Sequence, residues 1–287
     1  MPFKQSPFSS KSWLENCGPG GFEFHNSSGL VKTTIKGVPA LFTPYWALDC
    51  GLVLKSYNGD KYSLFAKEIS KRTEPYITID LPPCSDEFGF STTIVNQHTP
   101  SNIRIQWRHT RILELPSQLP SNRRKQVKRA EREMISCEEV QNWSNVHALH
   151  DESRNRKEIT NNSAQLDKLL KSISSEDYSF AVEAKSSQGE CIASGGFILL
   201  PNKRCLYAFG GQKRGPLSGI ASVAMLAEAM RIAKYKGAKW FDFGGSTDPG
   251  VDRFYKEFGA ISIPKPRLIK ISWWLRPILR LLRSDLN

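Results

Sequence analysis

Residues 203–260 read KRCLYAFGGQKRGPLSGIASVAMLAEAMRIAKYKGAKWFDFGGSTDPGVDRFYKEFGA, and this stretch decides the fold. A strand over 203–210 leads through a loop with several glycines into a long helix over 220–236, which has an apolar face at helical spacing and is ended by Gly237. A second strand follows over 239–243, and a short helix over 251–258 comes after the loop GGSTDPG. This order of strand, helix, strand and helix predicts an α/β layer.

The residues before this stretch extend the layer. Runs at 180–185 and 191–200 are expected strands joined by short turns, so with 203–210 they form an antiparallel meander. Helices are expected over 122–134, with Ser121 as its cap, and over 142–156 and 164–172. The predicted fold class is therefore α/β (α+β), with a curved, mostly antiparallel sheet flanked by helices.

The first part of the chain shows a different pattern of expected elements, with short strands and few helices. Its best helical candidate is 60–70, and glycine, proline and asparagine separate short β-like runs. These expected strands are 30–35, 52–55, 76–81, 91–95 and 102–107. Pro116 and Pro120 then interrupt the pattern, so we expect two domains, 1–115 and 116–287. Further strands are expected at 261–263 and 268–272.

Charge and cysteine content limit the class of protein. The chain has 287 residues, and 40 Lys and Arg against 28 Asp and Glu give a formal charge of +12. This excess favours an anionic partner: a nucleic acid, a phosphate-bearing cofactor or a membrane surface. The six cysteines form no Cys-x-x-Cys pair, so no metal site is predicted. Because no signal peptide or apolar run of about 18 residues is visible, we expect a cytoplasmic protein.

The loop GGQKRGPLSG at 210–219 is the strongest candidate for ligand binding. It connects a strand to a helix N-terminus, where successive backbone N–H groups and the helix dipole attract an anion. Its two cations add fixed charge, so the sequence predicts a pyrophosphate there; the alternative is an ordinary tight connection. The predicted cofactor-binding residues are Gly211, Gln212, Lys213, Arg214, Gly215, Ser218 and Gly219.

Two motifs around this loop resemble a known family. QKRGPLSGIA at 212–221 resembles the Q/R-x-x-G-x-G/A motif of the Gcn5-related N-acetyltransferases (GNAT), in which this loop binds the pyrophosphate of coenzyme A. RFYKEFGA at 253–260 resembles the Y-x-x-x-G-F/A signature, whose tyrosine protonates the departing thiolate. The resemblance implies acyl-CoA as the donor substrate and Tyr255 as the acid. The alternative is that Tyr255 is a packed aromatic residue.

A second resemblance covers more of the chain. AKWFDFGGSTDPGVDRFYKEFGA at 238–260 looks like the C-terminal signature of the Fem-type peptidoglycan aminoacyltransferases, and the likeness extends over about 116–262. That family implies two acetyltransferase-like lobes, the first of them binding the acceptor. Tyr255 stands where F-K-x-x-F-G has lysine, and no coiled-coil insertion accompanies it. Both departures weaken the tRNA-dependent interpretation.

Three functions are compatible with these residues. The first is an N-acyltransferase that moves an acyl group from an acyl-thioester donor of the acyl-CoA type to an amine acceptor. The second is a tRNA-dependent aminoacyltransferase acting on a cell-wall or lipid-linked precursor. The third is a non-catalytic member of the family that only binds.

Acidic residues near the predicted strand end at 243 are candidates for the base. Asp242 can orient or deprotonate the attacking amine, and Asp248 and Asp252 compete for this role. Structural alternatives exist, because Asp242 can cap the next turn and Asp248 can cap the following helix.

Two basic segments and a histidine pair complete the candidates. The helix at 121–134 carries Arg123, Arg124, Lys125, Lys128, Arg129 and Arg132, a set that suits tRNA or an ordinary solvated face. The tail at 264–283, with Trp273, Trp274 and several arginines, suits either a peripheral membrane contact or docking on the protein itself. His147 and His150 lie three residues apart on an expected helix and are interpreted as structural or substrate-contacting residues.

Overall fold

The computed structural model describes residues 5–24, 28–53, 59–159, 162–245 and 248–277. The chain divides into two compact units. One, the 110–262 unit, consists of Thr110–Ser262 with Met1–Pro7, and the other, the 8–109 unit, consists of Phe8–His109 with Ile263–Asn287.

This division differs from the expected domains 1–115 and 116–287 at the C-terminal end. The strand β11 (Ile261–Ile271) pairs antiparallel with β4 (Tyr76–Asp80), so most of it completes the sheet of the 8–109 unit. The two strands expected at 261–263 and 268–272 are one continuous strand.

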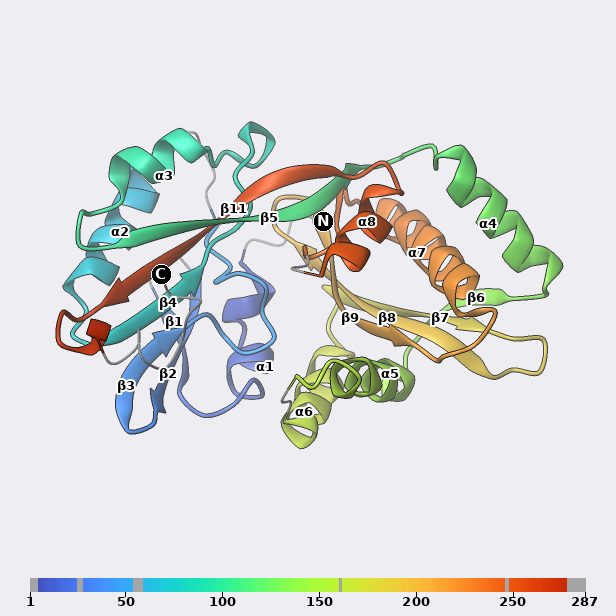
Figure 1. Ribbon diagram of the computed structural model, residues 1–287, viewed down its shortest axis with the longest axis horizontal. Helices are drawn as coiled ribbons and strands as arrows, with labels where there is room; N and C mark the ends of the chain where they lie inside the picture. The colour runs from blue at the N-terminus through green and yellow to red at the C-terminus, as the bar shows by residue number, and fades with distance from the viewer. Residues whose placement is uncertain (1–4, 25–27, 54–58, 160–161, 246–247, 278–287) are drawn as a thin grey trace. The chain divides into compact units, whose positions relative to one another are not determined.

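The 110–262 unit contains the stretch that decided the fold. Its elements are the C-terminal part of β5 (Arg104–Glu114), α4 (Ser121–Arg132), β6 (Ser136–Val140), α5 (Ser144–Asn155), α6 (Ser163–Ile173), β7 (Ser179–Lys185), β8 (Cys191–Leu200), β9 (Arg204–Gln212), α7 (Ser218–Tyr235), β10 (Trp240–Asp242) and α8 (Pro249–Lys256). The strand order is β5-β10-β9-β8-β7-β6, and only the β9–β10 pair is parallel. Helices α5 and α6 lie on one side of β7, β8 and β9, and α7 lies on the other (Figure 1).

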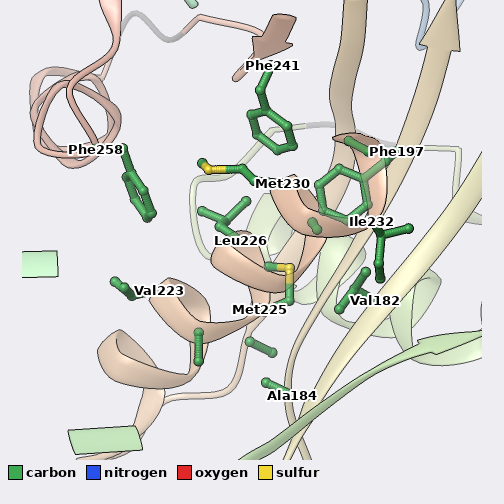
Figure 2. Close-up of a cluster of buried hydrophobic side chains, with 14 of the residues drawn as sticks. Val182, Ala184, Phe197, Val223, Met225, Leu226, Met230, Ile232, Phe241 and Phe258 are labelled. Atoms are coloured by element: carbon green, nitrogen blue, oxygen red, sulfur yellow. The ribbon is translucent and has the colours of Figure 1, made fainter. Parts of the chain in front are cut away.

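Helix α7 packs its apolar residues onto the sheet. Leu226 and Met230 lie near Phe197 of β8 and Phe241 of β10, and Val223 belongs to the same buried cluster (Figure 2). Burying one such side chain stabilises the fold by about 1.5–3 kcal/mol. The C-terminal end follows the expectation from sequence, because Gly237 takes a φ of 90° just after the helix. This packing fixes the N-terminus of α7 at the end of β9.

The 8–109 unit repeats the same order of elements. It contains the short helices η1 (Pro7–Ser9), α1 (Lys11–Leu14) and η3 (Asp86–Phe88), the strands β1 (Gly21–Phe24), β2 (Ser28–Ile35), β3 (Val38–Phe42) and β4, and the helices α2 (Asp60–Lys71) and α3 (Thr92–His98). The strands β1, β2 and β3 form an antiparallel meander, α2 follows, and β4 returns parallel to β3. In the 110–262 unit, β7, β8 and β9 form the meander, α7 follows, and β10 is the parallel strand. The prediction of an α/β fold with mostly antiparallel sheets flanked by helices is confirmed.

Several local predictions were wrong. Residues 91–95 form no strand, because Ser91 caps α3 through its side chain, which accepts a hydrogen bond from the Ile94 N–H at 3.2 Å. Ser121 does not cap α4: it is the first helical residue, and Pro120 occupies the N-cap position. Within the run expected at 52–55, residues 52 and 53 are not in a strand, and the others lie outside the described residues.

Candidate functional site

The strands β9 and β10 separate at the candidate site. They pair in parallel only where Trp240, Phe241 and Asp242 face Arg204, Cys205 and Leu206. The strand β10 ends at Asp242, whereas β9 continues to Gln212. Along this edge, no strand of the described residues pairs with 207–212, although α5 and its C-terminal cap bind two of its backbone groups, the Gly210 N–H and the Gln212 carbonyl. A ligand can therefore pair only with the rest of this stretch.

An irregularity in β9 lies at the point of separation. Gly196 of β8 faces Phe209 and Phe197 faces Tyr207, so Ala208 is an extra residue on the β9 side. Such a β-bulge bends the strand and re-aims its side chains. Tyr207 and the open edge of β9 therefore lie next to each other.

Two tyrosines lie near the end of β10. The ring of Tyr255, on α8, stacks on Phe243 with a centroid distance of 4.9 Å, and the ring of Tyr207 stacks on Phe197 at 5.3 Å. Burial raises the pKa of both phenols above the usual range, and the neighbouring Tyr207 and Asp242 add to the rise at Tyr255. Both groups therefore stay protonated at neutral pH and can donate a proton. The sequence singled out Tyr255, whereas Tyr207 carries no motif and was missed.

Asp242 lies in a buried ion pair. Its carboxylate is 3.0 Å from the Arg204 guanidinium, and both side chains are 3% exposed. The other carboxylate oxygen accepts hydrogen bonds from the Thr110 hydroxyl and, at 2.8 Å, from the Gly244 N–H. The bond to Gly244 is the turn cap that the sequence allowed as an alternative. Asp242 thus joins β5, β9 and β10 at the point where the strands separate.

The competing acidic residues also have structural partners. Asp248 caps α8 by accepting hydrogen bonds from the Gly250 and Val251 N–H groups at 2.9 and 3.3 Å, as the alternative interpretation predicted. Asp252 accepts two hydrogen bonds from Arg111 of β5, at 2.8 and 2.6 Å. Both carboxylates hold α8, and with it Tyr255, in place.

The first two predicted pyrophosphate residues belong to β9 instead of the loop. A Cβ on Gly211 would lie 2.1 Å from the Leu149 carbonyl oxygen, so this glycine is required for the approach of α5. The side chain of Gln212 accepts a hydrogen bond from the Ser222 hydroxyl, and its backbone carbonyl accepts one from Arg156 at 3.2 Å. The close approach of α5 explains the glycine at 211, as the alternative of an ordinary tight connection predicts, and pyrophosphate binding by Gly211 stays a prediction.

The rest of the loop leaves space at the N-terminus of α7. Among the described residues, a Cβ on Gly219 would have no atom within 4 Å outside the helix itself, and one on Gly215 would approach only the Ser218 hydroxyl, at 3.7 Å. No side chain of the described part of the chain caps this helix N-terminus. Arg214 is exposed, and Lys213 forms an ion pair with Glu190 at 2.6 Å. These residues leave room for an anion at the helix end.

The two histidines on α5 have different partners. His150 accepts a hydrogen bond from the Gly210 N–H at 3.3 Å, and burial, aided by Arg154, lowers the pKa of His150 to about 4. It is therefore neutral and ties α5 to β9. His147 instead lies 3.3 Å from Asp151. Among the described residues, no group of three His, Cys, Asp or Glu side chains is placed to bind a metal ion.

One of the six cations of the basic helix α4 is buried and cannot contact a partner. Arg123 is 2% exposed and lies between the rings of Phe254 and Phe258, 4.4 and 4.6 Å from their centroids. It donates to the Phe254 carbonyl at 2.7 Å and pairs with Glu257. Arg123 therefore fits neither of the two interpretations of the basic helix, contact with tRNA or a solvated face, because it is buried and joins α4 to α8. The other five cations of this helix are exposed.

Most of the described part of the tail belongs to a strand. Residues up to Ile271 belong to β11, and a helical turn begins at Leu275. The residues from 278 to 283 lie outside those described. Over the described ranges, no helix combines the length and hydrophobicity that crossing a membrane requires.

This fold was compared with those of known proteins. No protein-family model matches the sequence, and neither does any curated protein. Among solved structures, FemX is similar with a TM-score of 0.70 and 14% identity, covering 97% of this chain and 96% of FemX.

Two further structures are similar over nearly the whole chain. L-PGS from Bacillus licheniformis has a TM-score of 0.62 and 12% identity, covering 96% of this chain and 92% of its own. The C-terminal domain of a putative lysylphosphatidylglycerol synthetase from Agrobacterium fabrum has a TM-score of 0.61 and 10% identity, covering 99% and 93%. The expectation of a Fem-like fold is thus confirmed: this chain has the fold of FemX and of the lysylphosphatidylglycerol synthetase domain.

Proposed function

We propose that the protein transfers an acyl group from an acyl-thioester donor of the acyl-CoA type to an amine acceptor. The observation that carries this proposal is the edge of β9 that no described strand covers, which leads to the N-terminus of α7 and lies near Tyr255 through Tyr207. The donor's phosphate groups would bind at Gly215, Gly219 and Arg214. Its thioester would lie along the part of this edge that α5 leaves free, beside Tyr255.

The proposed reaction is a direct transfer. The neutral amine attacks the thioester carbonyl carbon, and a backbone N–H of the β9 edge stabilises the oxyanion. The carbon–sulfur bond then breaks, and the thiolate takes the Tyr255 hydroxyl proton while the ammonium of the adduct returns a proton to Tyr255. The phenol is regenerated in each turnover, so no separate acidic base is required. In this proposal Asp242 positions the separating strands and does not touch the amine.

A second candidate function is transfer of an aminoacyl group from tRNA. The similarity to FemX and to lysylphosphatidylglycerol synthetase over nearly the whole chain favours it. In this case the tRNA phosphates would contact the exposed cations of α4, and the ester would occupy the same β9 edge. Binding that falls steeply with salt, together with RNA in the purified protein, would favour this donor.

Replacing Gly219 by alanine is expected to separate donor binding from stability. The methyl group enters space that is open in the structure, and alanine raises helix stability by about 0.5–1 kcal/mol. If a phosphate binds there, the substitution weakens donor binding by about 10- to 100-fold, the equivalent of losing hydrogen bonds to a charged group. Calorimetric titration with coenzyme A and acetyl-coenzyme A measures the affinity, and thermal unfolding measures the stability.

Arg214→Ala is expected to lower the affinity for coenzyme A measured in the same titration. Lys61→Ala, which removes an exposed cation of α2, is the matched control. Wild-type protein that binds neither form of coenzyme A would overturn the acyl-CoA proposal and direct attention to aminoacyl-tRNA. Equal affinity of the wild type and Gly219→Ala would show that the donor does not bind at this helix end.

A further inference from the structure

Two tryptophans of the 8–109 unit are exposed directly after β11. Trp273 is 82% exposed and Trp274 is 42% exposed. A large aromatic side chain usually gains free energy by burial, so a pair left in solvent marks a contact surface more often than a single exposed residue does. Neither residue takes part in the candidate site.

The strand register brings a second exposed apolar residue to the same end of the sheet. Ile271 of β11 faces Tyr76 of β4, and Tyr76 faces Ala40 of β3. The turn that carries Trp273 comes directly after this end of β11, so it lies at the end of the sheet where β3 begins at Val38, whose partner on β2 is Ile35. Ile35 is 40% exposed. The tip of the β2–β3 hairpin and the turn after β11 lie at the same end of this sheet. We refer to this end of the sheet as its edge.

This edge is held in a fixed shape. Leu275 is 4% exposed and packs with Ala40 and Tyr76, and the Ser272 N–H donates to the Pro75 carbonyl at 2.9 Å. The hairpin tip is a tight turn, in which Lys36 and Gly37 have φ values of 48° and 81°. The exposed side chains are thus presented by a folded framework.

The edge also carries positive charge. Lys36 and Arg276 are exposed, and within the described part of the chain neither forms an ion pair. An indole places its apolar ring and its N–H group at the level of lipid headgroups, and nearby cations attract anionic lipids. Apolar, aromatic and cationic side chains here occupy one edge, as interfacial binding requires.

We propose that this edge, the Trp273 patch, docks the protein on the surface of an anionic lipid bilayer. The patch consists of Ile35, Lys36, Trp273, Trp274 and Arg276. The indoles and Ile35 enter the interfacial layer, and the two cations contact phosphate groups. The proposal is independent of the transfer reaction, since it uses no residue of the candidate site.

The test is co-sedimentation of the full chain with vesicles. One set contains phosphatidylcholine alone, and the other contains equal amounts of phosphatidylcholine and phosphatidylglycerol. We expect partitioning onto the anionic vesicles, with a loss of about tenfold in Trp273→Ser and a similar loss in Lys36→Glu. Tyr235→Ser is the matched control, because Tyr235 is 89% exposed and belongs to the 110–262 unit. It is expected to bind like the wild type.

Each contrary outcome overturns the proposal. Absence of wild-type binding to anionic vesicles does so directly. Unchanged binding by Trp273→Ser would show that the general positive charge of the protein, and not the patch, holds it to lipid. Self-association without lipid that Trp273→Ser abolishes would assign the patch to a contact between copies of the chain. Because Trp273 is so exposed, its replacement is expected to leave the melting temperature unchanged, and thermal unfolding verifies this.

Discussion

Replacing Asp242 by asparagine is expected to lower the free energy of unfolding by about 3–5 kcal/mol, because the buried Arg204 guanidinium loses this counter-charge. Both side chains are 3% exposed, so water screens their interaction little. Asparagine keeps the shape and an oxygen that can accept from the Gly244 N–H. Urea denaturation followed by circular dichroism measures the change.

The double variant Arg204→Met/Asp242→Leu provides the control. It removes both charges together, so it is expected to be more stable than Asp242→Asn alone. If the double variant were less stable than the single one, the loss would reflect packing and not the unpaired charge. An unchanged unfolding free energy in Asp242→Asn would show that the ion pair contributes little.

The same pair of variants separates the two roles of Asp242. As a positioning residue, Asp242 affects turnover through the separation of β9 and β10, and the folded double variant retains part of the activity. As the base, it is required chemically, so the folded double variant would be inactive. Kinetics on protein shown to be folded therefore decides between the structural and the catalytic prediction.

Replacing Tyr255 by phenylalanine is expected to lower kcat by about 100- to 10,000-fold, the usual contribution of a general acid. The ring stacked on Phe243 is retained, so the melting temperature should change little. Steady-state rates of acyl transfer to an amine, measured beside thermal unfolding, give both quantities. Tyr207→Phe is the matched control, because it removes a second buried phenol, on β9, that has no assigned proton-transfer role.

The pH profile provides a second test of Tyr255. Its pKa is raised by burial, so the acid form persists above the ordinary tyrosine value of about 10. The rate is therefore expected to show no decline due to Tyr255 between neutral pH and about pH 10. A Tyr255→Phe enzyme with wild-type kcat would remove this residue from the mechanism.

The order of elements was predictable from the sequence because most runs follow a clear period. The helix at Ser218–Tyr235 has an apolar face at helical spacing and a glycine at its end, and both signals agree with the structure. The strand predicted at 91–95 was wrong. The β-branched residues of this run favoured a strand, whereas the capping hydrogen bond of Ser91 favours a helix. A local capping contact outweighed propensity there.

The chemistry of the candidate site was only partly predictable. Tyr255 and the loop were found through motifs, and their roles in transfer remain predictions. A glycine in a sequence does not indicate whether a ligand or another part of the chain approaches it. Gly211 was therefore interpreted as a ligand-binding residue, although the backbone of α5 lies against it. Arg123 likewise looked like a surface cation, because the Phe254 and Phe258 rings that enclose it lie more than 120 residues later in the chain.

The pairing of β4 with β11 has a consequence for how the protein forms on the ribosome. Asp80 at the end of β4 is bound by Arg267, whose guanidinium donates two hydrogen bonds at 2.9 and 2.7 Å. These residues are 187 positions apart. The 8–109 part of the chain is synthesised early, but its sheet is complete only after β11, which follows Thr110–Ser262 in the sequence, has been made. The nascent 8–109 segment exposes an unpaired β4 edge throughout that interval, when a chaperone can bind it.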